Sequence, residues 1–441
     1  MAEAQNSDSM ISTKLQRIAE LAKRQPELSF TSLAHHIDVE LLLAAFQRTR
    51  RDGAPGIDGQ TATDYAANLE GNLRSLLDRA QSGRYQAPAV RRVYIPKGDG
   101  KELRPLGIPT FEDKVLQRAV AVVLNAVYEQ DFLPCSHGFR SKRSPRTALK
   151  SLWQQAMDMG GCVLVEVDVR KYFDSVDHGQ LRAILSQRVR DGVLTRLIGK
   201  WLNAGVLEAG SLWYPEAGTP QGGVISPLLA NIYLHTVLDV WFEEEVRPRL
   251  RGPCFLVRYA DDFVVGFARE DDARRFLAVL PQRFGKYGLT IHPDKTRMVD
   301  FRRPDLRSHT EGAEPTGRSF DFLGFTHFWA RSRRGGWVVR KKTAASRFRR
   351  TLRRIHLWCR AHRHCKVRDQ HATLSGMLQG HDGYFGVTGN WPSLARLRHA
   401  VLHSWRYWLD RRSQRHAMTW RRLLRWLQRY PLPAPRIYWT G

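Results

Sequence analysis

Two adjacent carboxylates lie between two apolar runs of this chain. Asp261 and Asp262 follow Tyr259-Ala260 and separate Phe255–Val257 from Phe263–Val265. A buried carboxylate costs several kcal/mol unless it is paired or binds a metal, so neighbouring acids in this setting indicate a cation site. Successive side chains of a strand face opposite ways, so we expect a tight hairpin turn that presents at least one carboxylate at the strand end. Acids of a solvated hairpin are the alternative if the run is taken alone.

A second apolar strand supplies the further acid that such a site needs. Val163–Val169 is rich in valine, contains Asp168, and runs into Tyr172-Phe173. If the strands ending at Asp168 and Asp261 pair in one sheet, the acids can hold two divalent ions about 3.5–4 Å apart, the arrangement that polymerases use for in-line phosphoryl transfer. Ligands that are all oxygen atoms favour Mg²⁺, with Mn²⁺ as a substitute.

Further motifs surround the two acidic strands in a fixed order. The motifs are Ile95–Gly100, Arg104–Thr110, His137–Arg140, Gly218–Ile232, Gly288–Ile291 with Lys295-Thr296, and Phe322–Phe325. Together with Tyr259–Asp262 they resemble the reverse transcriptases, and in detail the bacterial group II intron reverse transcriptase/maturase branch, from about residue 50 to the C-terminus. The resemblance implies an RNA-directed DNA polymerase, a nucleotidyltransferase that uses dNTPs and two metal ions.

The resemblance assigns the metal and triphosphate residues. Asp168 and Asp261 are expected to ligate both metal ions, with Asp262 as a supporting ligand. Lys97 and Arg104 occupy the fingers positions that meet the triphosphate, where cations stabilise phosphate charge. Two surface cations on a turn are the alternative for Lys97 and Arg104.

Two further residues are expected at the nucleotide. Phe173 stands where the family places an aromatic wall beneath the sugar, which leaves no room for a 2′-hydroxyl and favours deoxynucleotides. The alternative is a core aromatic, with Tyr172 facing the sheet. Lys295 is expected to donate a proton to the departing pyrophosphate; a surface lysine beside Pro293-Asp294 is the alternative.

Two glycine-containing segments are expected near the nucleic acid. Gln221 belongs to the dNTP-binding set, and the paired Gly222 and Gly223 let the backbone approach the nascent base pair. Phe322 and Gly324 resemble the turn that holds the primer. A helix entry without a ligand and simple packing are the respective alternatives.

Charge is concentrated at the C-terminal end. The chain of 441 residues has 70 Lys+Arg and 43 Asp+Glu, a net charge of +27, and residues 331–441 hold 26 of the former and 3 of the latter. So much positive charge repels itself unless a polyanion binds, so we expect a nucleic acid as partner. The resemblance implies that the partners are RNA and DNA, with group II intron RNA as template and splicing partner. The expected RNA-binding residues are Arg349, Arg350, Arg353, Arg411, Arg412, Arg421 and Arg422.

Eight of the thirteen tryptophans also lie in residues 331–441. Aromatic side chains among cations suit stacking on unpaired bases. Most of these tryptophans are nevertheless expected in the core, because Leu394, Leu397, Val401, Trp405, Trp408 and Leu409 form one stripe at helical spacing.

The patterns predict an α+β right-hand polymerase with a basic helical thumb. We expect a helical extension over 1–50, fingers and palm over 51–330 with an antiparallel sheet backed by helices, and a thumb/maturase domain over 331–441. Within these ranges the expected helices are 11–50, 61–80, 111–130, 144–158, 179–203, 394–409 and 420–427, the last capped by Thr419; 91–95 is an expected strand and 303–319 an expected loop.

Cysteine usage and hydropathy set the expected compartment. Five cysteines form no even framework, and the sequence shows neither a signal segment nor an apolar run of 18 residues, so a cytoplasmic protein without a membrane span is expected. The cluster from His356 to Cys365 matches no common zinc spacing, and whether it binds metal stays open. After residue 441 we expect no endonuclease module.

Three functions remain open from the residues. The first is a reverse transcriptase that binds its parent intron RNA, supports splicing and copies the RNA in retrohoming. The second is an RNA-binding splicing chaperone with little or no polymerase activity. The third is a reverse transcriptase recruited to phage defence or CRISPR spacer acquisition.

Overall fold

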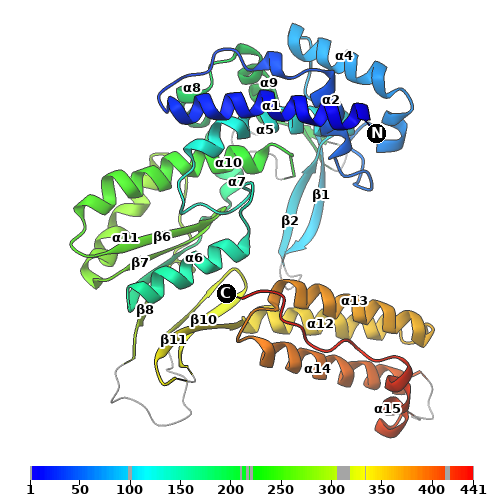
Figure 1. Cartoon of the computed structure of the whole chain (residues 1–441). Coiled ribbons are helices and arrows are strands. Elements are labelled where there is room, and N and C mark those ends of the chain that lie inside the picture. Colours follow the sequence, from blue (N-terminus) through cyan, green and yellow to red (C-terminus); the bar gives the residue numbers. More distant parts are fainter. Residues whose placement is uncertain are drawn as a thin grey trace. The chain divides into compact units, whose positions relative to one another are not determined.

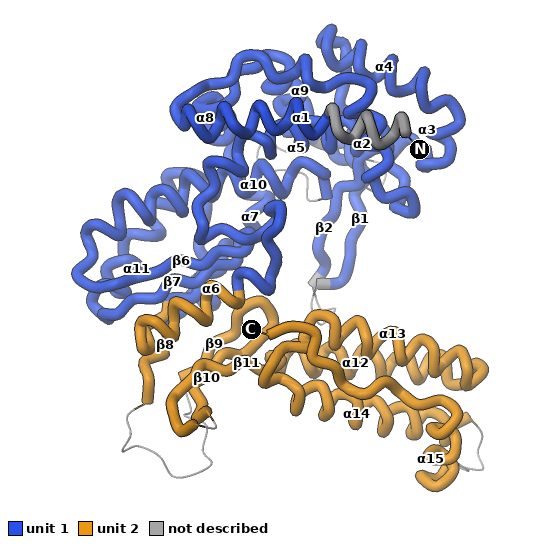
Figure 2. Tube along the Cα trace, in the orientation of Figure 1, with its two compact units in different colours: residues 1–148, 165–298 blue, residues 149–164, 299–441 orange. Residues whose placement is uncertain are grey.

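A computed structural model gives two compact units. It describes residues 2–97, 102–208, 211–214, 218, 222–304, 318–332, 334–412 and 418–440. Unit 1 comprises residues 1–148 and 165–298, and unit 2 comprises 149–164 and 299–441 (Figure 2). Each unit is therefore built from two separate stretches of chain.

Helices open unit 1 (Figure 1). They are α1 (Ala2–Arg24), η1 (Ala34–His36), α2 (Val39–Gln47), α3 (Ala62–Ala66), α4 (Leu69–Ser82) and α5 (Phe111–Asp131). The expected helix over 11–50 is interrupted after Arg24, because Pro26 lacks the amide hydrogen that a helix interior needs. The expected helix over 61–80 is likewise two helices. Helix α5 was expected over 111–130, and Thr110 caps it by accepting a bond from Asp113 N.

A four-stranded sheet of unit 1 contains Lys97 and Arg104, the two cations that are expected to meet the triphosphate. Its strands are β1 (Val90–Lys97), β2 (Glu102–Ile108), β4 (Val206–Glu208) and β5 (Ser211–Trp213), in the order β2-β1-β4-β5. Strands β1 and β2 form an antiparallel pair in which Ile95 lies opposite Arg104. The strand expected over 91–95 is present and is longer than predicted.

A second sheet carries the acidic strands. Its strands are β6 (Cys254–Tyr259), β7 (Asp262–Phe267), β3 (Gly161–Val167) and β8 (Arg297–Arg302), in the order β6-β7-β3-β8. The middle residues of β3, β6 and β7 are buried, which explains their continuous apolar runs. Mixed α and β structure with antiparallel pairs is thus confirmed.

Further helices complete unit 1. They are α7 (Tyr172–Ser175), α8 (His178–Arg188), α9 (Gly192–Leu202), α10 (Ser226–Leu234), η2 (His235–Val240), η3 (Phe242–Val246), η4 (Arg247–Arg249) and α11 (Glu270–Gly285), with α6 (Pro145–Asp158) shared between the units. The single helix expected over 179–203 is wrong. Asp191 ends it, because its carboxylate accepts bonds from Val193 N and Leu194 N and so starts α9.

Unit 2 combines a sheet with a helical bundle. Strands β9 (Ser319–Phe322), β10 (Phe325–Arg331) and β11 (Trp337–Thr343) form a sheet in the order β11-β10-β9, followed by α12 (Ala345–Ala361), α13 (Val367–Phe385), α14 (Trp391–Asp410) and α15 (Trp420–Arg429). Strand β11 corrects the expectation of helix from residue 331 onward: Val339, Lys341 and Thr343 alternate inward, the period of a strand. Residues 305–317 of the expected loop lie outside the described part.

The helical core of unit 2 confirms the predicted stripe. Leu397, Val401 and Trp405 are buried, and the indole of Trp405 donates to Gln370 Oε1 at 2.8 Å. Thr419 caps α15 as expected, accepting a bond from Arg422 N at 3.3 Å. No helix of the described residues is long and apolar enough to cross a bilayer.

Candidate active site

The expected hairpin turn joins β6 to β7. Tyr259 lies opposite Asp262, which leaves Ala260 and Asp261 as a two-residue loop. Ala260 has a φ of 58°, the left-handed value that such tight turns require. Asp261 is half-buried at the tip, whereas Asp262 is exposed as the first residue of β7.

Asp168 directly follows β3, the strand that neighbours β7. Its backbone carbonyl accepts a bond from His292 N at 2.8 Å. Burial raises the pKa of Asp261, the negative charge of Asp168 raises it further, and the charges of Arg104 and Arg258 lower it. Asp168 and Asp261 therefore lie within electrostatic reach of one another, as the two-strand interpretation requires.

Lys295 pairs with one of the two acids. Its Nζ atom is 2.9 Å from Oδ2 of Asp168, and its side chain is half-exposed. An ammonium group at this distance offsets part of the negative charge that the two carboxylates bring together. The lysine therefore has a specific partner at the site, whereas its part in proton transfer stays a prediction.

Of the three acids that are expected to ligate metal ions, two form a donor set that suits a divalent cation. Asp168 and Asp261 offer four carboxylate oxygens, which are ligands of the kind Mg²⁺ prefers. Burial raises the pKa of Asp261 most, and the charge of Asp168 raises it further; a bound cation would offset both effects. Among the described residues no group of three or more His, Cys, Asp or Glu gathers closely enough to hold a metal ion.

The structure describes some of the residues that are expected to bind the nucleotide. Arg104 is an exposed residue of β2 whose charge reaches Asp261. Tyr172 is 3% exposed and donates its hydroxyl to Ala230 O at 2.6 Å, while Phe173 is only half-buried. Tyr172 is thus the core aromatic of this pair, and contact of the half-buried Phe173 with a nucleotide stays a prediction. The side chain of Lys97 and all of Gln221 lie outside the described residues.

The glycine loop before α10 lies against β2. Gly222 has a φ of 119°, and a Cβ there would come within 2.4 Å of Gly107 O. Gly223 is buried, and Val224 N donates to Oε1 of Gln117 at 2.8 Å. Gly222 thus permits a close approach to the backbone of β2, and the expected approach of Gly222 and Gly223 to a base pair stays a prediction. Gln117, a residue that the sequence did not single out, fixes the following segment.

In unit 2, Phe322 and Gly324 flank the turn between β9 and β10. Phe322 is 5% exposed, Gly324 has a φ of 82°, and Tyr384 donates its hydroxyl to Leu323 O at 2.9 Å. The turn is therefore anchored on α13 within its own unit. Contact with a primer stays a prediction.

The expected RNA-binding arginines differ in their engagement. Arg349, Arg350 and Arg353 are exposed on α12, and Arg421 and Arg422 on α15. The Arg411 guanidinium lies 3.5 Å from the centre of the Tyr407 ring. Arg412 donates to the carbonyls of Arg363 and Cys365, so its guanidinium also binds the segment that connects α12 to α13.

The cysteine and histidine cluster is mostly accounted for by packing. Cys359 is buried in the core of unit 2, and Nδ1 of His356 lies 2.9 Å from the Ser404 hydroxyl. Cys365 is exposed, and all five cysteines are free.

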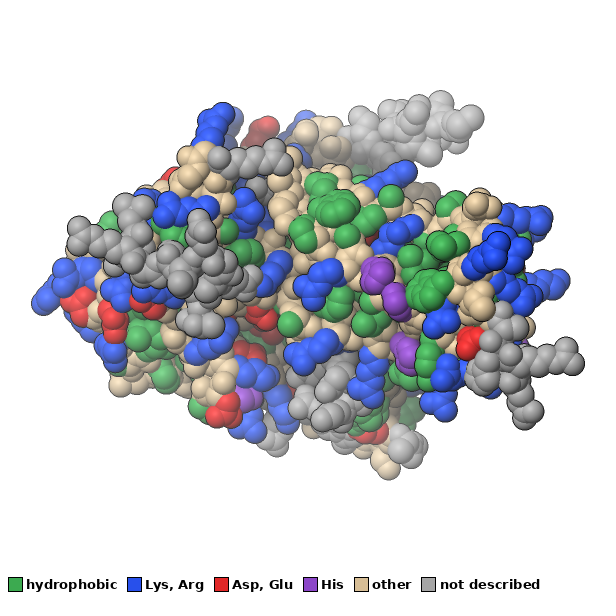
Figure 3. Space-filling view, turned by 90° about the horizontal axis from the view of Figure 1, so that it is seen from below, with side chains coloured by type: hydrophobic (Ala, Val, Ile, Leu, Met, Phe, Trp, Pro, Cys, Tyr) green, Lys and Arg blue, Asp and Glu red, His purple; other side chains and the backbone are tan. Residues whose placement is uncertain are grey.

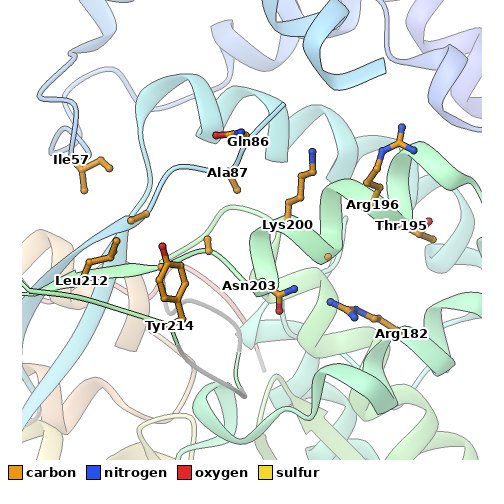
Figure 4. Close-up of a pocket in the computed structure, with 14 residues that line it drawn as sticks. Ile57, Gln86, Ala87, Arg182, Thr195, Arg196, Lys200, Asn203, Leu212 and Tyr214 are labelled. Carbon is orange, nitrogen blue, oxygen red and sulfur yellow. The ribbon is translucent and has the colours of Figure 1, made fainter. Parts of the chain in front are cut away.

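A cavity of about 860 Å³ lies in unit 1 apart from the acids (Figure 4). Arg182 of α8 and Arg196 and Lys200 of α9 line it together with Leu212 and Tyr214, which are exposed. No acid is among the described lining residues. Cations beside an exposed aromatic ring are features of single-strand binding surfaces.

A family model described as reverse transcriptase (RNA-dependent DNA polymerase) matches residues 95–327, more than half of the chain. The chain therefore belongs to the reverse transcriptase family. It is 38% identical over 226 residues to the group II intron-encoded protein LtrA of Lactococcus lactis subsp. cremoris, a match that covers 50% of this chain and 37% of LtrA.

Two other relatives extend the comparison. Protein YkfC of Escherichia coli (strain K12) is 36% identical over 289 residues, covering 58% of this chain and 76% of YkfC. The putative COX1/OXI3 intron 1 protein of Saccharomyces cerevisiae is 27% identical over 308 residues, covering 59% and 36%. The chain thus spans little more than a third of LtrA. The expected kinship with group II intron reverse transcriptases and maturases is confirmed.

Proposed function

We propose that this protein is an RNA-directed DNA polymerase that joins dNTPs to a primer by metal-assisted phosphoryl transfer. The observation that carries the proposal is the approach of Asp168 and Asp261 from neighbouring strands, in a chain of the reverse transcriptase family. Both residues belong to unit 1, as do Arg104 and Phe173.

The residues around Asp168 and Asp261 have different roles in the proposed reaction. Asp168 and Asp261 would hold the divalent cations, which activate the primer hydroxyl and stabilise the leaving pyrophosphate when bound. Arg104 supplies positive charge to the triphosphate without being consumed, as preorganised cations do in phosphoryl transfer. Phe173 limits the space at the sugar. Lys295 pairs with Asp168 at 2.9 Å and is the ammonium that we assign to proton donation.

Primer extension on an RNA template tests the proposal. Asp261→Asn should lower the extension rate by at least about 100-fold, because it removes one of the two charges that attract the cations. Asp271→Asn is the matched control: Asp271 is a surface acid paired with Arg269 at 2.9 Å and should leave the rate unchanged. Undiminished extension by the Asp261→Asn protein would refute the assignment.

We further propose group II intron RNA as partner and template, with splicing assistance and retrohoming as the biological outcome. The support is the printed identity of LtrA as an intron-encoded protein and the charge of residues 331–441. Figure 3 shows Lys and Arg side chains spread over the displayed face, with hydrophobic patches between them and few acids.

The Asp261→Asn protein also separates polymerase from splicing chaperone. Its RNA surfaces are untouched, so it should bind intron RNA and support splicing as the unchanged protein does. A wild-type protein that supports splicing but extends no primer would favour the chaperone function instead.

A further inference from the structure

The strand that leads into the catalytic hairpin contains a fully buried arginine. Arg258 of β6 and Asp239 of η2 are both 0% exposed. Nε of Arg258 donates to Oδ1 of Asp239 at 2.7 Å, and Nη2 donates to Oδ2 at 2.5 Å. An ion pair loses its hydration on burial, and apolar residues of similar volume often stabilise a fold as well. Stability alone therefore does not account for this pair.

The remaining donors of Arg258 reach the turn and its surroundings. Nη1 donates to Ala260 O at 3.1 Å and to Oδ1 of Asn231 at 2.9 Å, and Nη2 donates to the Ser136 hydroxyl at 2.8 Å. The carbonyl of Ala260 belongs to the peptide bond that precedes Asp261. Ala260 has the left-handed φ that a residue with a Cβ adopts only when its surroundings hold it there.

A second group of contacts restrains the same turn. Nδ2 of Asn231 donates to Gly138 O at 2.6 Å, and a Cβ at Gly138 would come within 2.3 Å of Ala260 N. His137 N donates to Arg258 O, and Arg258 N donates to Cys135 O, both at 2.8 Å. The segment 135–138 is thus bound along β6 and leaves the hairpin little freedom to shift.

We propose that Arg258 and Asp239 are positioning residues that set the place of Asp261. The inference rests on the proposed function, because it takes Asp261 to be a catalytic acid. Both residues of the pair are fully buried, so they act through the hairpin and not by contact with substrate. Asp239 orients the guanidinium, and the guanidinium fixes the peptide bond before Asp261.

The double variant Arg258→Met/Asp239→Leu tests this role. It replaces both charges by apolar groups, which avoids an unpaired buried charge and should keep the fold. The Mg²⁺ concentration for half-maximal extension should rise by about tenfold or more and kcat should fall by about 10- to 100-fold, because a small misplacement of a reacting group has effects of this size. Affinity for the primer–template should stay unchanged.

The matched control is Arg188→Met/Asp131→Leu. Nε of Arg188 is 2.8 Å from Oδ2 of Asp131, the pair is nearly buried, and Arg188 also binds backbone carbonyls. Arg188 ends α8 and Asp131 ends α5. The other bonds of the Arg188 guanidinium go to carbonyls of Ala22, Gln25 and Leu28 and not to the hairpin turn. Its loss should change melting temperature without changing the Mg²⁺ requirement.

The outcomes are distinct. A folded Arg258→Met/Asp239→Leu protein with wild-type Mg²⁺ requirement and kcat would overturn the inference. If that variant does not fold, Arg258→Lys decides by the same readout: its ammonium can pair with Asp239 but cannot reach all the other acceptors, so an intermediate Mg²⁺ requirement is expected, and a wild-type value overturns the inference. An inactive wild type or an active Asp261→Asn protein would instead refute the proposed function.

Discussion

At the scale of single residues, the sequence singled out the acids Asp168 and Asp261 but not the buried ion pair behind Asp261. Asp168 and Asp261 each follow an apolar run, so local sequence shows that a strand delivers them. Arg258 lies in β6, directly after the apolar run that leads to Asp261, and a cation inside a buried strand is itself a signal of a buried ion pair. Its partner Asp239 is 19 residues earlier, a pairing that only the folded chain reveals.

The titration of Asp261 should affect stability when no metal is bound. Burial and Asp168 raise its pKa, so the folded protein holds this proton more tightly than the unfolded chain. The resulting stability is present below the unfolded pKa and is lost as pH rises through the folded pKa. Asp261→Asn should therefore melt a few degrees above wild type at neutral pH in EDTA, but not in strong acid.

Thermal melts at two pH values check this expectation. Added Mg²⁺ should narrow the difference at neutral pH, because the cation stabilises only the ionised carboxylate of the wild type. An equal melting temperature of both proteins in EDTA at neutral pH would show that the ionised carboxylate of Asp261 does not lower the stability of the fold.

Phe173 and Tyr172 offer a matched pair for sugar discrimination. Phe173→Ala should raise ribonucleotide incorporation relative to deoxynucleotide incorporation by at least about tenfold, because it removes the ring that occupies the space of a 2′-hydroxyl. Tyr172→Phe removes only the bond to Ala230 O, at a cost of about 1 kcal/mol in stability, and should leave the selection unchanged. Competition assays with both nucleotide types would measure it.

At the scale of elements, sequence succeeded where the determinants are local. The N-cap at Thr419 and the stripe around Trp405 were predicted because a cap and a helical period extend over few residues. The break before α9 was missed, since Asp191 also accepts bonds from Leu33 N and Ala34 N, about 157 residues earlier. A long-range partner thus selected the cap over helix continuation.

The loop before α10 should tolerate no side chain at Gly222. Gly222→Ala would combine a φ of 119° with a contact of 2.4 Å to Gly107 O, a strain of about 1–3 kcal/mol. We expect lower stability and a higher KM for dNTPs, since the loop would have to leave β2. Gly376→Ala is the control: it has open space within α13 and should stabilise by about 1 kcal/mol. Urea unfolding and steady-state kinetics of both variants would decide.

At the scale of the whole molecule, composition alone suggested a nucleic-acid partner, which stays a proposal, whereas the sequence predicted the architecture only in part. Net charge needs no knowledge of the fold, whereas the strand β11 within the basic region was mistaken for helix. The lysines and valines of β11 fit a helix or a strand from sequence alone. The structure shows a strand, because Val339 and Lys341 both face inward.

The exposed arginines of α12 should contribute to the salt dependence of RNA binding. Replacing Arg349, Arg350 and Arg353 by Ala should reduce the slope of log K against log salt by about 2, because each phosphate contact on a single strand releases about 0.7 counterion. Arg247, Arg249 and Arg274 pair with neighbouring glutamates, so their replacement is the control that should leave the slope unaltered. Titrations at several salt concentrations would show no difference between the two triple variants if α12 does not bind RNA.

The chain enters unit 2 at residue 149, leaves it after residue 164 and returns only at residue 299. The early stretch is anchored by late residues: Trp153 donates to Val339 O at 3.0 Å, and Gly161 is packed against Arg302 and Arg303. During synthesis, helix α6 must therefore wait on the order of 10 s for its partners in unit 2 to emerge from the ribosome, whereas strand β3 can pair with β7 earlier. A nascent chain halted at residue 298 would keep unit 1 largely whole while leaving the β8 edge of the apolar strand β3 unpaired and open to chaperones.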